Sequence, residues 1–181
     1  MKRTRPSIAG VVSDRSDAFG LQRALDHGLD SRCLREPSAI WSWLLELDVD
    51  LVVLAGYLRL LPIVPEFAGR VLNIHPSLLP DFPGLGAAAR QWRAGVRVAG
   101  ATVHYVSPGL DDGPIIAQAA VPVMSADTEE SLAARVLAAE HRLYPLALAL
   151  VARGEAPVEN GIVRTPGIAS GVLYSPPAPE I

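Results

Sequence analysis

Three polar side chains of this sequence, an amide, an imidazole and a carboxylate, are spaced so that two chain reversals could bring them together. Asn73 and His75 lie in the stretch L-N-I-H-P-S-L-L-P (residues 72–80), and Asp111 lies in the stretch L-D-D-G-P-I (residues 110–115). An amide and an imidazole can donate hydrogen bonds to a developing oxyanion, while a carboxylate holds or charges the imidazole. The trio therefore suits acyl chemistry on a neutral carbonyl.

The residues around Asn73 predict a strand end that presents two polar groups on one side. Residues i and i+2 of an extended segment share a face, so Asn73 and His75 project together while Ile74 points into the core. Asp111 and Asp112 lie in a predicted turn between two strands. A carboxylate beside His75 favours the protonated imidazole, which can act as a proton donor.

Each of these residues also has a structural interpretation. Asn73 could cap a turn, His75 could be a hydrogen-bonded, half-buried histidine, and D-D-G-P is a common turn sequence. His104, in A-T-V-H-Y-V, suits a pocket wall or a packed histidine better than a catalyst. A hydrolase triad of Ser77, His75 and an aspartate is weaker, because neighbours on one tight segment bond poorly and no G-x-S-x-G motif exists. A metal site of His75, His104 and Asp111 lacks a recognised ligand spacing.

Length and composition set the broad class. A chain of 181 residues, half of them hydrophobic and 19% charged, predicts one compact globular domain rather than a disordered chain. The net charge of −3 gives no overall field that would gather nucleic acid. Cys33 is the only cysteine, which excludes an intramolecular disulfide and favours a reducing compartment. The sequence predicts neither a signal peptide nor a membrane span, so we expect a soluble, cytoplasmic protein.

Strand and helix patterns alternate along the chain. Apolar runs predict strands over 7–12, 49–55, 71–75, 101–106 and 115–123. Helical periodicity predicts helices over 17–27, 38–47, 87–94 and 128–153, with a short helical turn from Pro65. Ser38 is expected to cap the second helix, Asp127 and Glu130 to form a capping box for the last, and Pro145 to kink or split it.

The alternation predicts an α/β three-layer, Rossmann-like fold with a mostly parallel sheet and helices on both faces. In such folds ligands bind beyond the carboxyl ends of the strands, where the N-x-H stretch lies. We expect one domain over residues 1–165 and an irregular C-terminal arm over residues 166–181, which contain S-P-P-A-P.

Four stretches identify a resemblance: G-Y-L-R-L-L (56–61), N-I-H-P-S-L-L-P-D-F-P-G-L (73–85), G-A-T-V-H-Y-V (100–106) and L-D-D-G-P-I-I (110–116). In order and spacing they resemble the folate-dependent formyltransferases, over residues 9–163 of this chain. The resemblance is nearest to the branch that formylates glycinamide ribonucleotide in purine biosynthesis. It implies a transferase of one-carbon metabolism that uses 10-formyltetrahydrofolate as co-substrate and a small-molecule amine as acceptor.

The resemblance also implies roles for individual residues. It assigns catalysis to Asn73, His75 and Asp111: the amine attacks the formyl carbon, the first two residues stabilise the oxyanion, and Asp111 tunes His75 and helps to move a proton. It places the folate against Arg59, Leu60, Leu61, Asn73, Pro108, Gly109, Leu110 and Asp111. It places the amine substrate against Gly56, Ile74, Pro76, His104 and Glu140, and it implies no metal.

The sequence departs from the family pattern in two places. Family members begin with a strand and a phosphate-cradling, glycine-rich loop, and the strand over 7–12 matches their second strand, so about 30 family residues lack a counterpart. The sheet should then have a gap unless another segment, or the second subunit of a homodimer, fills it. Near the acceptor, Gly86 to Ala89 and Leu137 stand where polar residues are expected. Arg15, Arg90 and Arg93 are candidate phosphate partners.

These departures leave the acceptor open. It is glycinamide ribonucleotide or a different amine. One alternative activity is a formyltetrahydrofolate deformylase, with water as the acceptor. Another is a non-catalytic folate-binding protein or a subunit that depends on a partner.

Overall fold

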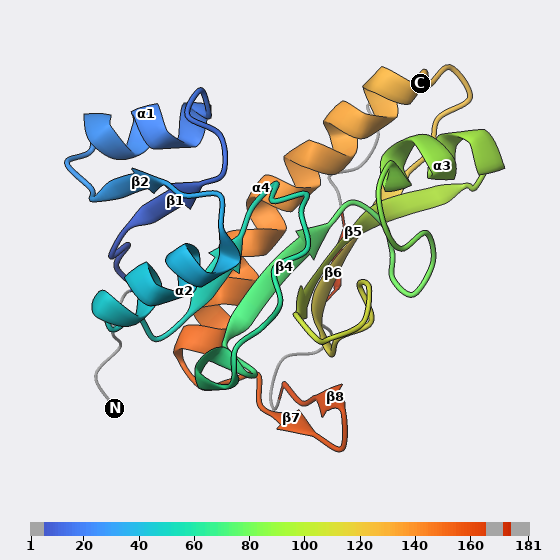
Figure 1. Cartoon of the computed structure of the whole chain (residues 1–181). Helices are drawn as coiled ribbons and strands as arrows, with labels where there is room; N and C mark the ends of the chain where they lie inside the picture. Colours follow the sequence, from blue (N-terminus) through green and yellow to red (C-terminus); the bar gives the residue numbers. More distant parts are fainter. Residues whose placement is uncertain (1–5, 166–171, 175–181) are drawn as a thin grey trace.

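The computed structural model describes residues 6–165 and 172–174 of the chain (Figure 1). In chain order the elements are β1 (Val11–Ser13), α1 (Phe19–Asp26), β2 (Ser31–Cys33), α2 (Pro37–Glu46), β3 (Val52–Leu54), the 3₁₀ turn η1 (Pro65–Phe67), β4 (Val71–His75), α3 (Ala87–Ala94), β5 (Val98–Tyr105), β6 (Ile115–Pro122), α4 (Glu129–Ala152), β7 (Val158–Glu159), β8 (Ile162–Val163) and β9 (Val172–Tyr174).

The described strands form three sheets. The largest has the order β3-β4-β5-β6-β9, with β3–β4 and β6–β9 parallel and β4–β5 and β5–β6 antiparallel. A second sheet is the parallel pair β1–β2, and the third is the small hairpin β7–β8. The predicted α/β class is confirmed. The gap that the sequence leads us to expect is also seen, since β1 pairs with β2 and β3 pairs with β4 but β1 and β3 do not pair.

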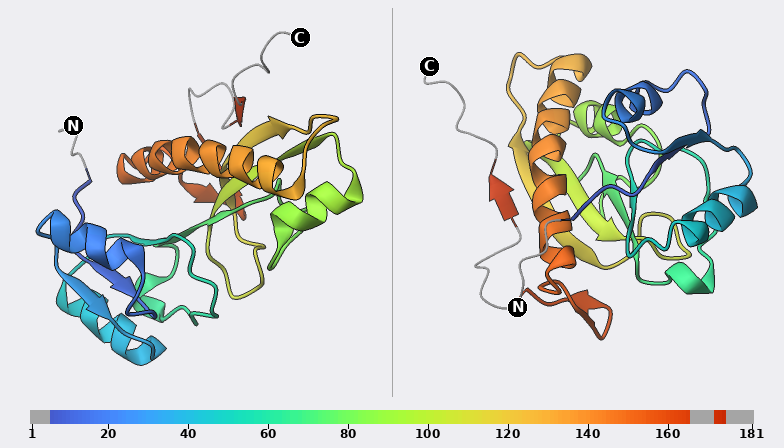
Figure 2. Two further views of the ribbon diagram at one scale, coloured as in Figure 1. Left: turned by 90° about the horizontal axis from the view of Figure 1, so that it is seen from above. Right: turned by 90° about the vertical axis from the view of Figure 1, so that its left-hand side faces the viewer.

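Strand β4 separates two hydrophobic layers because its successive side chains point to opposite faces. Val71 belongs to a core with residues of α2 and with Phe67, whereas Leu72 belongs to a core with α4, β5 and β6. Ile74 packs against this second core, as predicted. Helices therefore cover both faces, and Figure 2 shows α4 along one side of the large sheet.

The capping box of α4 lies one residue further along the chain than predicted. Thr128 has extended backbone angles and accepts a hydrogen bond from the Ser131 N–H, while the Ser131 hydroxyl accepts one from the Thr128 N–H. The prediction of Asp127 and Glu130 as the box is therefore wrong. Asp127 stands just outside the helix, where its carboxylate accepts from the Met124 N–H at 2.7 Å. Pro145 lies inside α4 without splitting it.

Helix α2 also begins differently from the prediction. Glu36, with extended backbone angles, is its N-cap, and Pro37 takes the first helical position, where the missing N–H costs nothing. Ser38 is thus inside the helix and is not its cap.

Other differences concern short elements. Strands β1, β2 and β3 are each only three residues long. Strand β2 was not predicted, because S-R-C carries no apolar pattern. The two-residue strands β7 and β8 were not predicted either. In the arm predicted to be irregular, Val172–Tyr174 pair with β6, and the other arm residues lie outside the described ones.

The unit of α1, β1 and β2 is tied to the remainder by packing rather than by strand pairing. Trp43 of α2 lies so close to Gly10 that a Cβ at this glycine would come within 2.7 Å of the indole ring. Ile8, Phe19 and Leu25 of this unit are more than 60% exposed. No helix of residues 6–165 is long and apolar enough to cross a bilayer.

Candidate active site

One face of β4, β5 and β6 carries a row of polar side chains. In the strand register Asn73 pairs with His104, His75 pairs with Thr102, and Thr102 pairs with Gln118. Paired residues of neighbouring strands point to the same side of a sheet, so these groups form one polar surface. A register shift between Val103 and His104 marks a bulge beside it, a feature that often re-aims side chains near functional sites.

His75 lies between two oxygen acceptors. Its Nδ1 atom is 3.3 Å from Oδ2 of Asp111, and its Nε2 atom is 2.9 Å from the carbonyl oxygen of Phe82. A carbonyl and a carboxylate can only accept, so the imidazole satisfies both when each nitrogen carries a proton. The ring is only 5% exposed, which reduces competition from water. This geometry provides the imidazole and carboxylate contact that the sequence predicts.

The turn before β6 places Asp111 in this contact. Asp111 has a left-handed backbone with φ of 52°, and its Oδ2 atom accepts a hydrogen bond from the Gly84 N–H at 2.7 Å. Gly113 is required two residues later, because a Cβ there would lie 1.8 Å from the Tyr105 carbonyl oxygen. The D-D-G-P sequence is therefore a turn and also a support for the carboxylate.

Asn73 contacts His104 on the neighbouring strand. The Asn73 amide nitrogen and Nε2 of His104 are 3.4 Å apart, and Nδ1 of His104 lies 2.9 Å from the Tyr105 carbonyl oxygen. Burial lowers the pKa of His104, which favours the neutral ring. Its Nδ1–H then donates to the carbonyl, and the bare Nε2 accepts from the Asn73 amide. His104 is thus a buried neighbour of Asn73 and lies 3.8 Å from Oδ1 of Asp111.

The weaker chemistries find no support in this geometry. The Ser77 hydroxyl is fully buried and donates to the Asp81 carbonyl oxygen at 2.6 Å, so it is not hydrogen-bonded to His75 as a triad requires. No group of three or more His, Cys, Asp or Glu side chains in the described part of the chain is arranged to hold a metal ion.

The residues predicted to hold the folate occupy two loops with different exposure. Leu60 and Leu110 are 81% and 69% exposed and offer apolar surface. Leu61, in contrast, is buried in the α2 core. Arg59 donates to the Arg35 carbonyl oxygen at 3.0 Å and lies 3.9 Å from Asp14. Pro108 and Gly109 are exposed beside Leu110.

The residues predicted to hold the amine substrate lie around the ends of β3 and β4. Gly56 follows β3 with φ of +70°, and the Pro76 carbonyl oxygen accepts from Gln91. Glu140 is on α4, one turn before Tyr144, whose hydroxyl donates to the Leu54 carbonyl oxygen at 2.7 Å. Residues i and i+4 share a helix face, so Glu140 faces the same strands. Burial raises the pKa of Glu140 to about 7.

The three candidate phosphate arginines all have protein partners. Arg90 donates to the carbonyl oxygens of Phe82, Pro83 and Gly84. Arg93 pairs with Glu129, and Arg15 pairs with Asp17 on the surface. Each would have to exchange this partner to bind a phosphate.

Several polar residues of the site were not singled out from the sequence. Thr102 and Gln91 are almost completely buried, and Gln118 is half-buried. The alternation of Thr102 and His104 on one strand was the available signal. It identifies a polar face only once the pairing of β4 with β5 is known.

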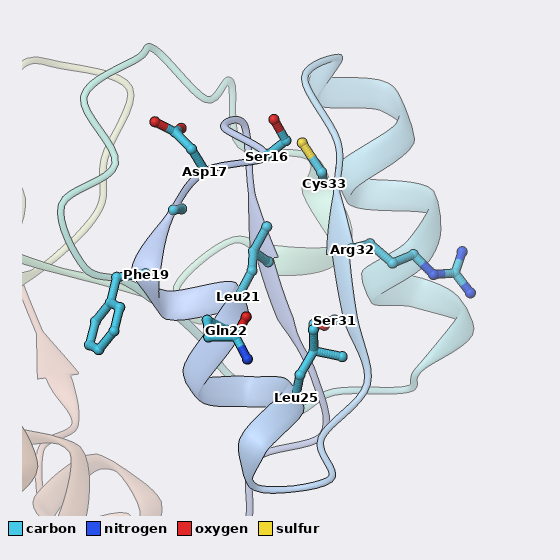
Figure 3. A pocket seen from close by; sticks show the side chains of 10 residues that line it. Ser16, Asp17, Phe19, Leu21, Gln22, Leu25, Ser31, Arg32 and Cys33 are labelled. Carbon is cyan, nitrogen blue, oxygen red and sulfur yellow. The ribbon is translucent and has the colours of Figure 1, made fainter.

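A surface hollow elsewhere is separate from this cluster. It has a volume of about 440 Å³ and lies between α1 and β2 (Figure 3). Its lining includes Phe19, Leu25 and Cys33 and none of the predicted site residues.

The fold is that of an α/β protein in which an amide, an imidazole and a carboxylate lie close together, linked by the contacts of Asp111 with His75 and His104 and of His104 with Asn73. A sequence model described as formyl transferase matches residues 2–148, and the chain belongs to this family. Glycinamide ribonucleotide formyltransferases use 10-formyltetrahydrofolate as the formyl donor, in agreement with the co-substrate that the motifs imply.

Individual relatives are similar over most of this chain. The phosphoribosylglycinamide formyltransferase of Bacillus subtilis is 48% identical over 77% of this chain and 77% of its own length. The crystal structure of the Anaplasma phagocytophilum phosphoribosylglycinamide formyltransferase is 43% identical, covers 93% of this chain and 86% of that one, and has a TM-score of 0.89.

Two further relatives are longer proteins. The trifunctional purine biosynthetic protein adenosine-3 of Gallus gallus is 45% identical over 81% of this chain, which spans only 16% of that protein. A formyltetrahydrofolate deformylase from Pseudomonas syringae is 30% identical with a TM-score of 0.80, over 87% of this chain and 56% of that one.

Proposed function

We propose that this protein transfers a formyl group from 10-formyltetrahydrofolate to the amine of glycinamide ribonucleotide. The observation that carries the proposal is the contact of His75 with Asp111 at 3.3 Å beside Asn73, in a chain of the formyl transferase family. The names of the similar proteins support glycinamide ribonucleotide as the acceptor.

In the proposed reaction the acceptor amine forms a bond to the formyl carbon, whose oxygen becomes an oxyanion. The Asn73 amide donates to this oxygen. The Nδ1–H of His75, which faces Asp111 at 3.3 Å, turns to the same oxygen as Asp111 takes up the amine proton, while the Nε2–H stays with Phe82. The amine proton passes to the Asp111 carboxylate, directly or through water. The bond between the formyl carbon and N10 then breaks, and N10 takes up a proton to give tetrahydrofolate.

Substrate placement follows from the two sides of the cluster. The exposed leucines Leu60 and Leu110 would bind the flat, partly apolar folate, with Arg59, Leu61 and the backbone of Pro108 and Gly109. Glu140 would accept hydrogen bonds from hydroxyl groups of the acceptor, with Gly56, Pro76 and His104 nearby. Ile74 supports this side from the core.

The test is turnover with and without acceptor. Purified protein is mixed with 10-formyltetrahydrofolate, and tetrahydrofolate is followed by absorbance and formylated product by mass spectrometry. We expect both products only when glycinamide ribonucleotide is present. Equal release of tetrahydrofolate without an amine would show the deformylase, and folate binding without turnover would show a binding protein.

We also propose that a further strand completes the sheet, supplied by a second copy of the chain. The support is the pair of free edges: β1 and β3 each have one strand neighbour among the described residues, and Val53 of β3 is 40% exposed. Unpaired strand edges invite pairing with another chain. Analytical ultracentrifugation should give twice the 19.2 kDa of one chain, and a monomer would contradict the proposal.

A cytoplasmic setting is proposed on the cysteine alone. Cys33 is exposed and free, which suits a reducing compartment. Cell fractionation with an antibody against the protein tests this location.

A further inference from the structure

Thr102 is buried directly beside His75 and has every hydrogen-bonding group satisfied. Its hydroxyl donates to the Ser77 carbonyl oxygen at 2.6 Å and accepts from the Leu79 N–H at 3.0 Å and from Nε2 of Gln118 at 3.1 Å. A threonine hydroxyl has one donor and two acceptor sites, so none is left over. The side chain is 0% exposed.

Gln118 attaches the same loop at a second point. Its amide nitrogen also donates to the Leu79 carbonyl oxygen at 2.9 Å. His75, Thr102 and Gln118 are cross-strand neighbours on β4, β5 and β6. The loop that follows His75 is therefore held against the sheet by the two residues next to His75 in the row.

The held loop returns to His75 within a few residues. The Ser77 hydroxyl donates to the Asp81 carbonyl oxygen at 2.6 Å, and the next carbonyl, that of Phe82, accepts from Nε2 of His75 at 2.9 Å. Arg90 donates to this same Phe82 oxygen at 2.9 Å. The orientation of the imidazole thus depends on the Phe82 oxygen, which Arg90 contacts directly and which belongs to the loop that Ser77 and Thr102 hold in place.

We propose that Thr102 is a positioning residue for His75. Through Ser77 and Leu79 it fixes the loop whose Phe82 carbonyl orients the ring, and it thereby points Nδ1 at Asp111 and at the reacting oxygen. The kinetic part of this inference rests on the proposed formyl transfer. The structural part, the hydrogen bond from Nε2 of His75, does not.

A purely structural threonine would give a different response to substitution. Removing its hydroxyl would lower stability and leave the imidazole and the rate per folded molecule unchanged. A positioning threonine changes kcat, because a shift of about 1 Å in a reacting group can cost on the order of 100-fold in rate. The folate KM should change much less, since Thr102 is buried away from the exposed leucines.

The experiment compares Thr102→Val, which keeps the shape but removes the hydroxyl, with the matched control Thr102→Ser, which retains the hydroxyl. Gln118→Met is the second variant, because Gln118 is half-buried and tolerates replacement if Thr102→Val does not fold. Each protein is labelled with ¹⁵N-histidine, and the side-chain N–H signals of the four histidines are recorded. A His75→Ala sample assigns the His75 signal.

The Nε2–H of His75 should be protected from exchange in the wild type and in Thr102→Ser, and should broaden or disappear in Thr102→Val and Gln118→Met. In turnover, kcat should fall by at least about tenfold in these two variants, with folate KM within about threefold and with Thr102→Ser near wild type. A folded Thr102→Val or Gln118→Met protein with an unchanged His75 signal overturns the inference. If the wild type shows no turnover, the proposed function fails, and the histidine signal still decides the role of Thr102.

Discussion

The layer of β4, β5, β6 and α4 and the unit of α1, β1 and β2 differ in how their strands are covered. Seven of the eight residues of β5 are buried, whereas no residue of β1 or β2 is. Of the predicted catalytic trio, Asn73 and His75 stand on β4 and Asp111 stands in the turn before β6. The candidate catalytic residues therefore lie on the part of the fold whose strands are buried and tightly packed.

The two regions also differ in the hydrogen-bond partners of their polar side chains. In the β4–β6 layer Thr102, Gln118 and His104 are hydrogen-bonded to backbone carbonyl oxygens, those of Ser77, Leu79 and Tyr105, so these side chains are held in place before any substrate binds. In the α1 unit the polar contacts are surface pairs such as Arg15 with Asp17, which contribute little. Preorganisation is thus concentrated where charge would develop in the proposed reaction.

The largest expected effect is the loss of turnover in Asp111→Asn. The change removes the carboxylate that faces His75 and that accepts the amine proton in the proposed reaction, so kcat should fall by about 10²–10⁴-fold. Asparagine tolerates the left-handed backbone at this position, so the fold should persist. The matched control is Asp112→Asn, an exposed neighbour whose rate should stay within about threefold of wild type. Activity in Asp111→Asn similar to that of the control would disprove the mechanism.

The next largest effect is a difference in stability between leucine substitutions in the two regions. Leu132 of α4 is 0% exposed, so Leu132→Ala should lower the free energy of unfolding by about 2–5 kcal/mol. Leu25 of α1 is 62% exposed, and Leu25→Ala should cost less than about 1 kcal/mol. Urea unfolding of both variants gives the two values. A large loss in Leu25→Ala would mean that the α1 face is covered in solution, as the proposed dimer could do.

A third variant tests the polar start of α4. The carboxylate of Asp127 accepts from the Met124 N–H and from both terminal nitrogens of the Arg135 guanidinium, and these contacts hold its pKa well below the ordinary value of 3.8. Asp127→Asn should therefore lower stability by about 1–2 kcal/mol at neutral pH.

The pH dependence of this difference has a definite sign. A group whose pKa is depressed in the folded state stabilises the fold above its unfolded pKa, and the stabilisation is lost as pH falls. The gap between wild type and Asp127→Asn should therefore shrink below about pH 4, as measured by thermal melting across that range. A gap that stays constant down to pH 2 would show that the contribution is not ionic.

Much of the fold could be predicted from the sequence, because apolar segments show a clear strand or helix periodicity. The ranges of β4 and α3 agree with the prediction to the residue, and Asn73, Ile74 and His75 alternate as strand geometry requires. The cap of α4 was misplaced because Asp127, Thr128 and Ser131 all carry capping side chains, and only backbone angles show which residue is the cap.

The parts of the site that escaped prediction depend on long-range pairing. Phe82 enters through its backbone carbonyl, which every residue possesses, so its side chain gives no signal. Thr102 matters because β5 aligns it with His75, 27 positions away in sequence, a register that local patterns do not specify. Glu140 was predicted only from the resemblance to the family. Its raised pKa comes from burial on α4, which the sequence does not show.

The smallest expected effect concerns that carboxyl group. Burial raises the pKa of Glu140 from 4.5 to about 7, so the folded protein holds this proton more tightly than the unfolded chain. Its contribution to stability is complete below pH 4.5 and declines as pH rises to about 7. Glu140→Gln keeps the shape without the charge and should be slightly more stable than wild type at pH 8 and equal to it at pH 4.

The same variant separates stability from acceptor binding. The ionised Glu140 is the better hydrogen-bond acceptor, so the wild-type KM for glycinamide ribonucleotide should fall as pH rises through about 7, while the KM of Glu140→Gln should be higher and independent of pH. The folate KM should follow the same pH profile in both proteins, because Glu140 faces the amine side. A wild-type acceptor KM that is flat across this range would place Glu140 outside the acceptor site, even though it is attached to the well-packed layer.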